Sequence, residues 1–252
     1  MINALTVVKE TNNFEHMPKL LFAADSGSRS KGYATPFSDL DVFAIYVRHP
    51  DDYITITDPK ERFFTEAVIA GELAQVQLWD LRDVIKRLGR DTTVFNAMRR
   101  TSAITAFVNQ IPLAVERDIY GHPVDTIGLI HSNLNWKHTD NTFKGVMQHC
   151  YVSMAARYLL ECGTGDACYL MPVNILSLVS IISGVPDGFF SLFSSVLSNG
   201  IENSDESYRE LSFMLHQIDA ESRTRVLALT RTKSVEDYRD TIFKRSIKRI
   251  WK

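Results

Sequence analysis

The period of the hydrophobic pattern changes near residue 90, and this change constrains the fold of the 252-residue chain more than any other feature. Before residue 90, short apolar segments alternate between two faces or are apolar on both, which is typical of β-strands. After it, apolar residues recur almost only at helical spacing, as in residues 143–161 and 208–229. The pattern predicts an α+β protein, with a small mixed-sheet domain over residues 1–90 followed by a helical domain over 91–252.

Four strands are predicted in the first domain. Residues 19–24 and 40–48 form two buried strands, and residues 61–69 and 72–79 form a hairpin around Ala70-Gly71. In strand 40–48, alternation places Asp41 on the side of Phe43 and the residues that follow at every second position. Polar Gln75 and Gln77 alternate with apolar residues in the second hairpin arm in the same way.

Helix boundaries can be assigned at three places after the hairpin. Asp80 is predicted to cap a helix that begins at Leu81, because a side-chain oxygen at that position can accept from the first free backbone N–H groups. Asp91 is predicted to cap a further helix over residues 92–100. Ser234 begins the last helix, which carries an apolar stripe through Ile242 and Ile247.

The net charge is only −2, so no overall attraction to nucleic acid or membrane is expected. The charge is uneven, however, because residues 223–252 contain ten Lys or Arg and three Asp or Glu. Basic residues 244–252 either contact an anionic partner such as RNA or form a solvated helix face. The chain shows no signal peptide, no membrane span and no disulfide framework among its three cysteines, so we expect a cytoplasmic protein.

One short stretch, GSRSKGYATPFSDLDVFAIYV, carries residues that a stable fold does not require. Gly27-Ser28 follows the first buried strand, where glycine lets the backbone approach a ligand and exposed N–H groups form an anion site. Arg29 and Lys31 add positive charge beside it. Two parallel neighbouring strands are expected to bring this turn close to the start of strand 40–48.

Asp39 and Asp41 lie at the start of that strand, two residues apart, and so share one face. Neighbouring carboxylates raise each other's pKa unless a cation lies between them. Mg²⁺, or Mn²⁺ in its place, suits this role because it prefers carboxylate oxygens together with substrate phosphates. Each motif alone is common in solvated turns, whereas both together at the ends of buried strands favour a metal–phosphate site with Asp39 and Asp41 as metal ligands.

Gly-Ser, a gap of about ten residues, then Asp-x-Asp and an apolar strand resembles the polymerase-β-type nucleotidyltransferase superfamily. The fuller stretch, with Trp79-Asp80-Leu81-Arg82 opening a helix, is most similar to the bacterial and phage nucleotidyltransferases associated with RNA ligases. Residues 144–157 resemble the helical region of that branch more weakly. The resemblance implies metal binding and catalysis by Asp39 and Asp41, and binding of the phosphates of a nucleoside triphosphate, ATP among them, by Gly27, Ser28 and Arg29.

The resemblance implies a reaction as well, and one residue departs from it. Such enzymes transfer a nucleoside monophosphate to a hydroxyl acceptor, which could be an RNA end, a protein side chain or a small molecule. They usually have a third carboxylate on a later strand, expected here at Gln75 or Gln77, and glutamine cannot act as a base. Glu72 is a substitute only if the nearby turn re-aims it. The chain is therefore an enzyme with an unusual third acid, an enzyme of altered activity, or a degenerate module that binds a nucleotide or regulates a partner.

The histidines are further candidates for metal ligands. His131 and His138 are the nearest suitable pair in the sequence, but a zinc site would need further ligands close by. With Trp136 and Lys137 between them, they could instead contact a substrate base or phosphate.

Overall fold

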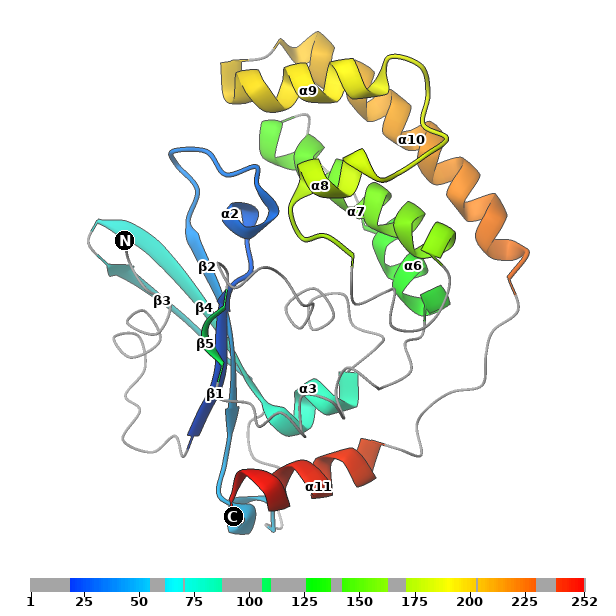
Figure 1. The fold of residues 1–252 in the computed structure, drawn as a ribbon. Helices are drawn as coiled ribbons and strands as arrows, with labels where there is room; N and C mark the ends of the chain where they lie inside the picture. Colours follow the sequence, from blue (N-terminus) through cyan, green and yellow to red (C-terminus); the bar gives the residue numbers. More distant parts are fainter. Residues whose placement is uncertain are drawn as a thin grey trace.

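The structure is a computed structural model that describes residues 19–54, 62–69, 71–87, 106–109, 126–136, 142–162, 171–202, 204–229 and 239–251. Figure 1 shows a sheet with helices beside the lower part of one of its faces and a separate group of helices above them. The elements are β1 (Lys19–Asp25), α2 (Ser28–Lys31), β2 (Leu40–Val47), η2 (Pro50–Tyr53), β3 (Arg62–Ile69), β4 (Glu72–Asp80), α3 (Leu81–Arg87), β5 (Ala106–Asn109), α6 (Thr126–Leu134), α7 (Phe143–Cys162), α8 (Ile175–Ser180), α9 (Phe189–Asn199), η4 (Gly200–Glu202), α10 (Asp205–Leu227) and α11 (Arg239–Ile250).

The strands form one mixed sheet in the order β3-β4-β2-β1-β5. β2 and β4 run parallel, and the other neighbouring strands pair antiparallel. The predicted strands and the hairpin are confirmed, and a mixed sheet followed by helices is the α+β fold that the sequence predicts. The expectation that β1 and β2 run parallel is wrong, because the connection between them turns the chain back on itself.

Side-chain alternation in β2 and β4 divides the core into two layers, as predicted. Phe43, Ile45 and Trp79 belong to one cluster, which α3 and α11 cover. The opposite face carries small and branched residues, including Val42 and Val76. The predicted helix cap is also present, because the Asp80 carboxylate accepts a hydrogen bond from the backbone N–H of Arg82 at 2.8 Å.

Two elements from beyond residue 90 join the sheet part of the molecule. β5 pairs with β1 at the edge of the sheet, and α11 packs its buried Ile242 and Ile250 into the cluster beneath β2. Conversely, Tyr33 from the β1–β2 connection is buried in the helical core around α7. The division into domains at residue 90 stays a prediction, and these contacts tie the two parts together.

Some predictions fall outside the described residues: the helix over 92–100, the start of the last helix at Ser234, and His138. The described part of that last helix begins at Arg239. No described helix combines the length and the apolar character that crossing a membrane requires.

Candidate active site

The turn after β1 is folded against the start of β2. Because β1 and β2 pair antiparallel, Asp25 at the end of β1 lies opposite Val42, one residue beyond Asp41. The backbone N–H of Ser26 donates a 2.9 Å hydrogen bond to the carbonyl oxygen of Asp41. The Gly-Ser turn and the aspartate pair are therefore neighbours, although by antiparallel rather than parallel pairing.

Gly27 is in direct contact with the carboxylate of Asp41. A Cβ atom at position 27 would lie 1.8 Å from Asp41 Oδ2 and 2.6 Å from its Cγ, so any side chain there would force Asp41 to shift. The φ angle of Gly27 is −88°, so glycine is required here for space and not for a left-handed backbone. The close approach joins the two sequence motifs into one site.

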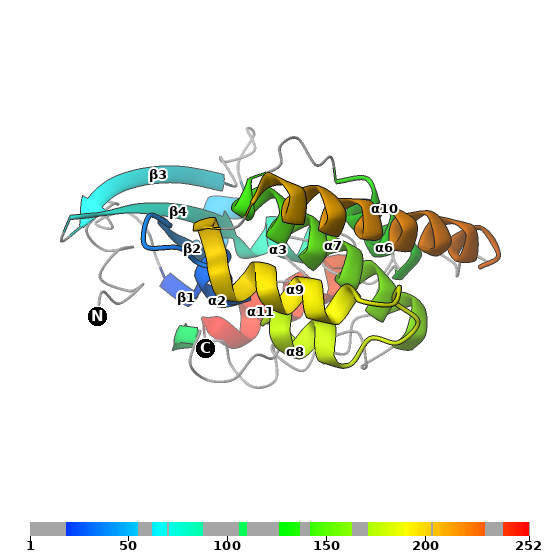
Figure 2. The same cartoon turned by 90° about the horizontal axis from the view of Figure 1, so that it is seen from above.

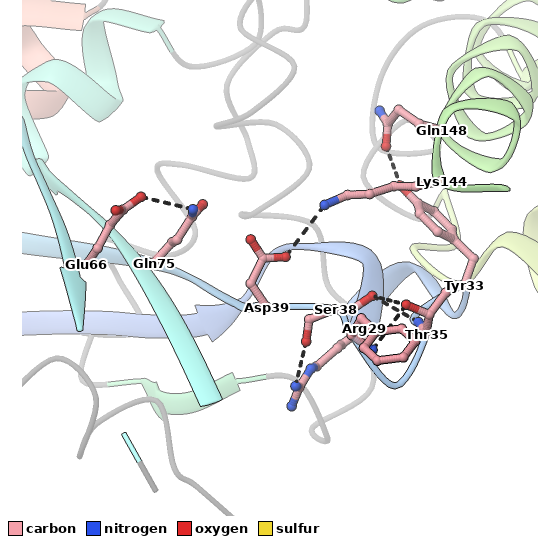
Figure 3. Close-up of polar contacts among 10 residues, drawn as sticks. Arg29, Tyr33, Thr35, Ser38, Asp39, Glu66, Gln75, Lys144 and Gln148 are labelled. Carbon is pink, nitrogen blue, oxygen red and sulfur yellow. Dashed lines mark hydrogen bonds and ion pairs between the residues drawn. The ribbon is translucent and has the colours of Figure 1, made fainter. Parts of the chain in front are cut away.

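Asp41 lies on the sheet face of Phe43 and Ile45, with Asp39 two residues before it. Burial raises the pKa of the Asp41 carboxyl, and the charge of Asp39 raises it further. Lys144 of α7 opposes this effect and lies with its Nζ 3.5 Å from Asp39 Oδ1 (Figure 3). A pair of carboxylates with this electrostatic environment fits a divalent cation, because such an ion would neutralise both.

Asp25 is a further acid at the site that the sequence analysis did not select. Burial raises its pKa to about 6, against hydrogen bonding from the backbone of Gly27 and the charge of Arg29, and Asp41 adds to the rise. Its Oδ1 is buried and has no hydrogen-bond partner among the described residues. The sequence does contain a signal for Asp25, because an aspartate at the end of a buried strand and beside a functional turn is seldom fully solvated.

Arg29 and Glu72 form an ion pair across the site. Arg29 Nη2 lies 2.9 Å from Glu72 Oε2 and donates to the carbonyl oxygen of Ser38 at 2.9 Å. Glu72 is thus paired with the predicted phosphate-binding arginine. Ser28, which is also predicted to bind phosphate, is buried, and its hydroxyl has no hydrogen-bond partner in the part of the chain that the structure describes.

Gln75 occupies the place next to Asp41. In the parallel pairing of β2 with β4, Gln75 is the register partner of Asp41, and Gln77 is the partner of Phe43. On the other side of β4, Gln75 pairs with Glu66 of β3, and Gln75 Nε2 donates to Glu66 Oε1 at 3.0 Å. Asp41, Gln75 and Glu66 are therefore register partners in one row across three strands. Figure 3 shows the hydrogen bond between Gln75 and Glu66 in this row.

Helix α7 supplies residues that the sequence analysis placed only in a region of weak resemblance. Besides Lys144, Gln148 of α7 accepts hydrogen bonds from Lys31 Nζ, at 3.0 Å, and from the hydroxyl of Tyr33. The Lys31 ammonium also lies over the ring of Tyr151, 5.0 Å from its centroid. Lysines from α2 and α7 therefore lie near the carboxylate pair. Local sequence patterns could not predict this, because α2 and α7 are far apart in the sequence.

The predicted basic helix face is present at the opposite end of the same sheet face. α11 buries Ile242 and packs Ile247 and Trp251 against the core cluster beneath the sheet. Four described basic side chains of α11 are exposed: Lys244, Arg245, Lys248 and Arg249.

The comparison with known protein families finds a similarity in the first part of the chain. Residues 2–99 match the model of a family described as "RlaP: RNA repair pathway DNA polymerase beta family". The matched segment contains β1 to β4 and both motifs of the site, which confirms the resemblance that the motifs indicated. No curated protein matches the chain.

Proposed function

We propose that this protein is a nucleotidyltransferase of RNA repair that transfers a nucleoside monophosphate from a nucleoside triphosphate to a hydroxyl acceptor at an RNA end. The observation that carries the proposal is the contact of the Gly27 backbone with the Asp41 carboxylate. Because Gly27 has no side chain, triphosphate oxygens can approach the backbone next to the two carboxylates that would bind the metal ion. The similarity of residues 2–99 to a polymerase-β-type family of RNA repair supports the same reaction.

Asp39 and Asp41 would hold Mg²⁺ or Mn²⁺, which supplies charge neutralisation at the phosphates and lowers the pKa of a bound hydroxyl. In the reaction, the acceptor oxygen bonds to the α-phosphorus, the bond to the β-phosphate breaks, and pyrophosphate leaves. Lys31 and Lys144 contribute positive charge near the two aspartates. This charge favours binding of the triphosphate and stabilises the leaving pyrophosphate.

Glu66 is the acid that we propose in place of the missing third carboxylate. It lies on the same sheet face as Asp41, one strand beyond Gln75, and the Gln75 amide holds it by a hydrogen bond. A glutamate side chain is longer than that of an aspartate, and the Glu66 carboxylate reaches the Gln75 side chain on the neighbouring strand. In this role Glu66 would accept the proton of the attacking hydroxyl.

Gln75 also supports a second candidate function. If Gln75 has replaced the acid without compensation, the site binds a nucleotide and regulates a partner without catalysis. Gln75→Asp separates the two functions, because it places a carboxylate at the register position opposite Asp41.

The test uses each labelled triphosphate with Mg²⁺ or Mn²⁺ and RNA with a free 3′ hydroxyl. We expect transfer by the wild type, loss with Asp39→Ala or Asp41→Ala, and a fall of about 100-fold with Glu66→Gln, the typical effect of removing a general base. An inactive wild type that gains transfer through Gln75→Asp would support the binding module instead. Full activity of Glu66→Gln would remove Glu66 from the reaction.

We propose that RNA follows the exposed basic face of α11, which covers the far end of the sheet face that carries Asp41. Changing Lys244, Arg245, Lys248 and Arg249 to Gln should weaken RNA binding and reduce the slope of log K against log salt by about 0.7 per lost contact. Unchanged affinity and slope would identify α11 as a solvated helix.

A further inference from the structure

α7 and α10 bring together three side chains of the types that bind transition metals, on a face of α7 that meets α10. His149 of α7 lies against His216 and Asp219 of α10, and one donor atom from each lies within 4.8 Å of the others. His149 Nε2 and Asp219 Oδ2 are 2.9 Å apart, and the two imidazole ring centroids are 4.9 Å apart. Two imidazoles and one carboxylate are a donor set that zinc uses in proteins.

The arrangement of the helices holds the three donors together. His216 and Asp219 are three residues apart on α10 and therefore lie on the same side of that helix. His149 reaches them from α7, which packs beside α10 in both views (Figures 1 and 2). The local sequence around each histidine gives no metal-ligand spacing, because the site depends on a contact between segments 70 residues apart.

The distances are compatible with a metal after small movements. Bonds of 2.0–2.1 Å to a tetrahedral zinc ion place neighbouring donor atoms about 3.3 Å apart. The pair His149–Asp219 would widen by a few tenths of an ångström, and His216 would move inward. His216 is exposed, so its ring can turn without disturbing the core.

Burial is graded across the cluster in a way that suits a bound ion. His149 is 2% exposed, Asp219 is partly buried, and His216 is exposed. The ring centroid of Trp136, which packs against the helical core, lies 6.3 Å from that of His149. Two ligands would be held firmly, while the third and a water molecule at the fourth position would face solvent.

We propose that His149, His216 and Asp219 bind one Zn²⁺ ion that ties α7 to α10. The competing explanation is a hydrogen bond between His149 and Asp219 that joins the helices without a metal. The ion would stabilise the helix that carries Lys144, whose ammonium lies beside Asp39. The proposal depends on the helical contact alone and stands whether or not the protein transfers nucleotides.

The experiment titrates zinc into the full-length protein, freed of metal with a chelator, in competition with a chromogenic zinc indicator. His216→Ala and Asp219→Asn test the cluster, and His49→Ala, an exposed histidine in the sheet part, is the matched control. Asp39→Ala/Asp41→Ala removes the other acidic site. Circular dichroism without zinc verifies that each variant folds, and cobalt spectra report the ligand geometry.

We expect one zinc ion per chain in the wild type, in His49→Ala and in Asp39→Ala/Asp41→Ala. His216→Ala and Asp219→Asn should weaken binding about 100-fold or more, since loss of an outer-shell partner alone costs 10–100-fold. Absence of saturable zinc binding in the wild type would overturn the proposal. Wild-type affinity in both cluster variants, or binding that disappears with Asp39 and Asp41, would overturn it equally.

Discussion

At the residue scale, the candidate site depends on the absence of one side chain. Gly27 and Asp41 come from two different motifs, and the backbone of one touches the carboxylate of the other. The sequence predicted that both residues belong to one site. It also predicted that they lie close together, but on the assumption that β1 and β2 run parallel, which is wrong. Only the antiparallel pairing of β1 and β2 explains why the motifs are separated by so short a connection.

Gly27→Ala should disable the site by displacing Asp41. The added Cβ would lie 1.8 Å from Asp41 Oδ2, so the carboxylate must move. Overpacking of this kind lowers the unfolding free energy by about 1–3 kcal/mol. A displacement of the Asp41 carboxylate by about 1 Å should lower the rate of nucleotide transfer on the order of 100-fold. Urea unfolding and steady-state kinetics measure both effects.

Gly71→Ala is the matched control for this change. Gly71 has a φ of +86°, and no atom lies within 4 Å of the place that an added Cβ would take. The variant should therefore lose about 1–2 kcal/mol of stability to backbone strain alone. Its transfer activity should equal that of the wild type. Equal activity losses in both variants would contradict the argument from space.

Asp25→Asn should change the pH dependence of stability. Burial raises the pKa of Asp25 from 3.8 to about 6, so the folded protein binds this proton more tightly than the unfolded chain does. The wild type therefore loses stability as pH rises through this interval, and the variant lacks that loss. Its unfolding free energy relative to wild type should increase between pH 4 and 6 and stay constant above, as measured by urea unfolding. A difference that is flat across pH, or that shrinks as pH rises, would refute this.

At the scale of elements, the site is assembled from the start of β2, the α2 turn and the face of α7. The hairpin β3–β4 adds the row in which Gln75 separates Asp41 from Glu66. The sequence predicted the hairpin and the face of β4 on which Gln75 lies, because the two-residue alternation of a strand is a local pattern. It could not select Glu66, since its neighbours across the sheet depend on the strand order.

Lys144→Ala should weaken triphosphate binding with little effect on folding. Lys144 is largely exposed and lies 3.5 Å from Asp39, where its charge lowers the pKa of Asp41. An exposed charge interaction contributes about 1 kcal/mol at most, so KM for the triphosphate should rise by up to about fivefold. Lys244→Ala, on the exposed face of α11, should leave KM unchanged, and a similar rise in both variants would indicate a nonspecific effect of charge.

At the scale of the whole molecule, the first and the last described elements, β1 and α11, share a core. α11 lies beneath β2 beside α3, where Ile242 and Ile250 are buried and Phe243 contacts Tyr53 edge to face at 5.1 Å. Tyr33 makes the reverse connection, because it leaves the sheet part and enters the helical core. The apolar stripe predicted a buried face for this helix but not the surface that it covers.

Ile242→Ala should therefore destabilise the sheet part of the molecule. Removing a buried isoleucine side chain costs about 2–5 kcal/mol through lost transfer free energy and the cavity that remains. Ile201→Ala, at an exposed isoleucine, should change stability by about 0.5 kcal/mol or less. The midpoints of urea unfolding compare the two, and equal shifts would mean that α11 contributes no core.

The sequence by itself determined strands β1 to β4, but not β5, together with the faces of β2 and β4, the cap at Asp80 and the residues of the two motifs. These follow from local periodicity and backbone chemistry, which act over a few residues. The tertiary structure decided the direction of β1, the arrival of Lys144 and Gln148 beside Asp39, the row from Asp41 to Glu66 and the meeting of His149 with Asp219. Each of these is a contact between distant segments, and it is set by how helices and strands bury their apolar faces together.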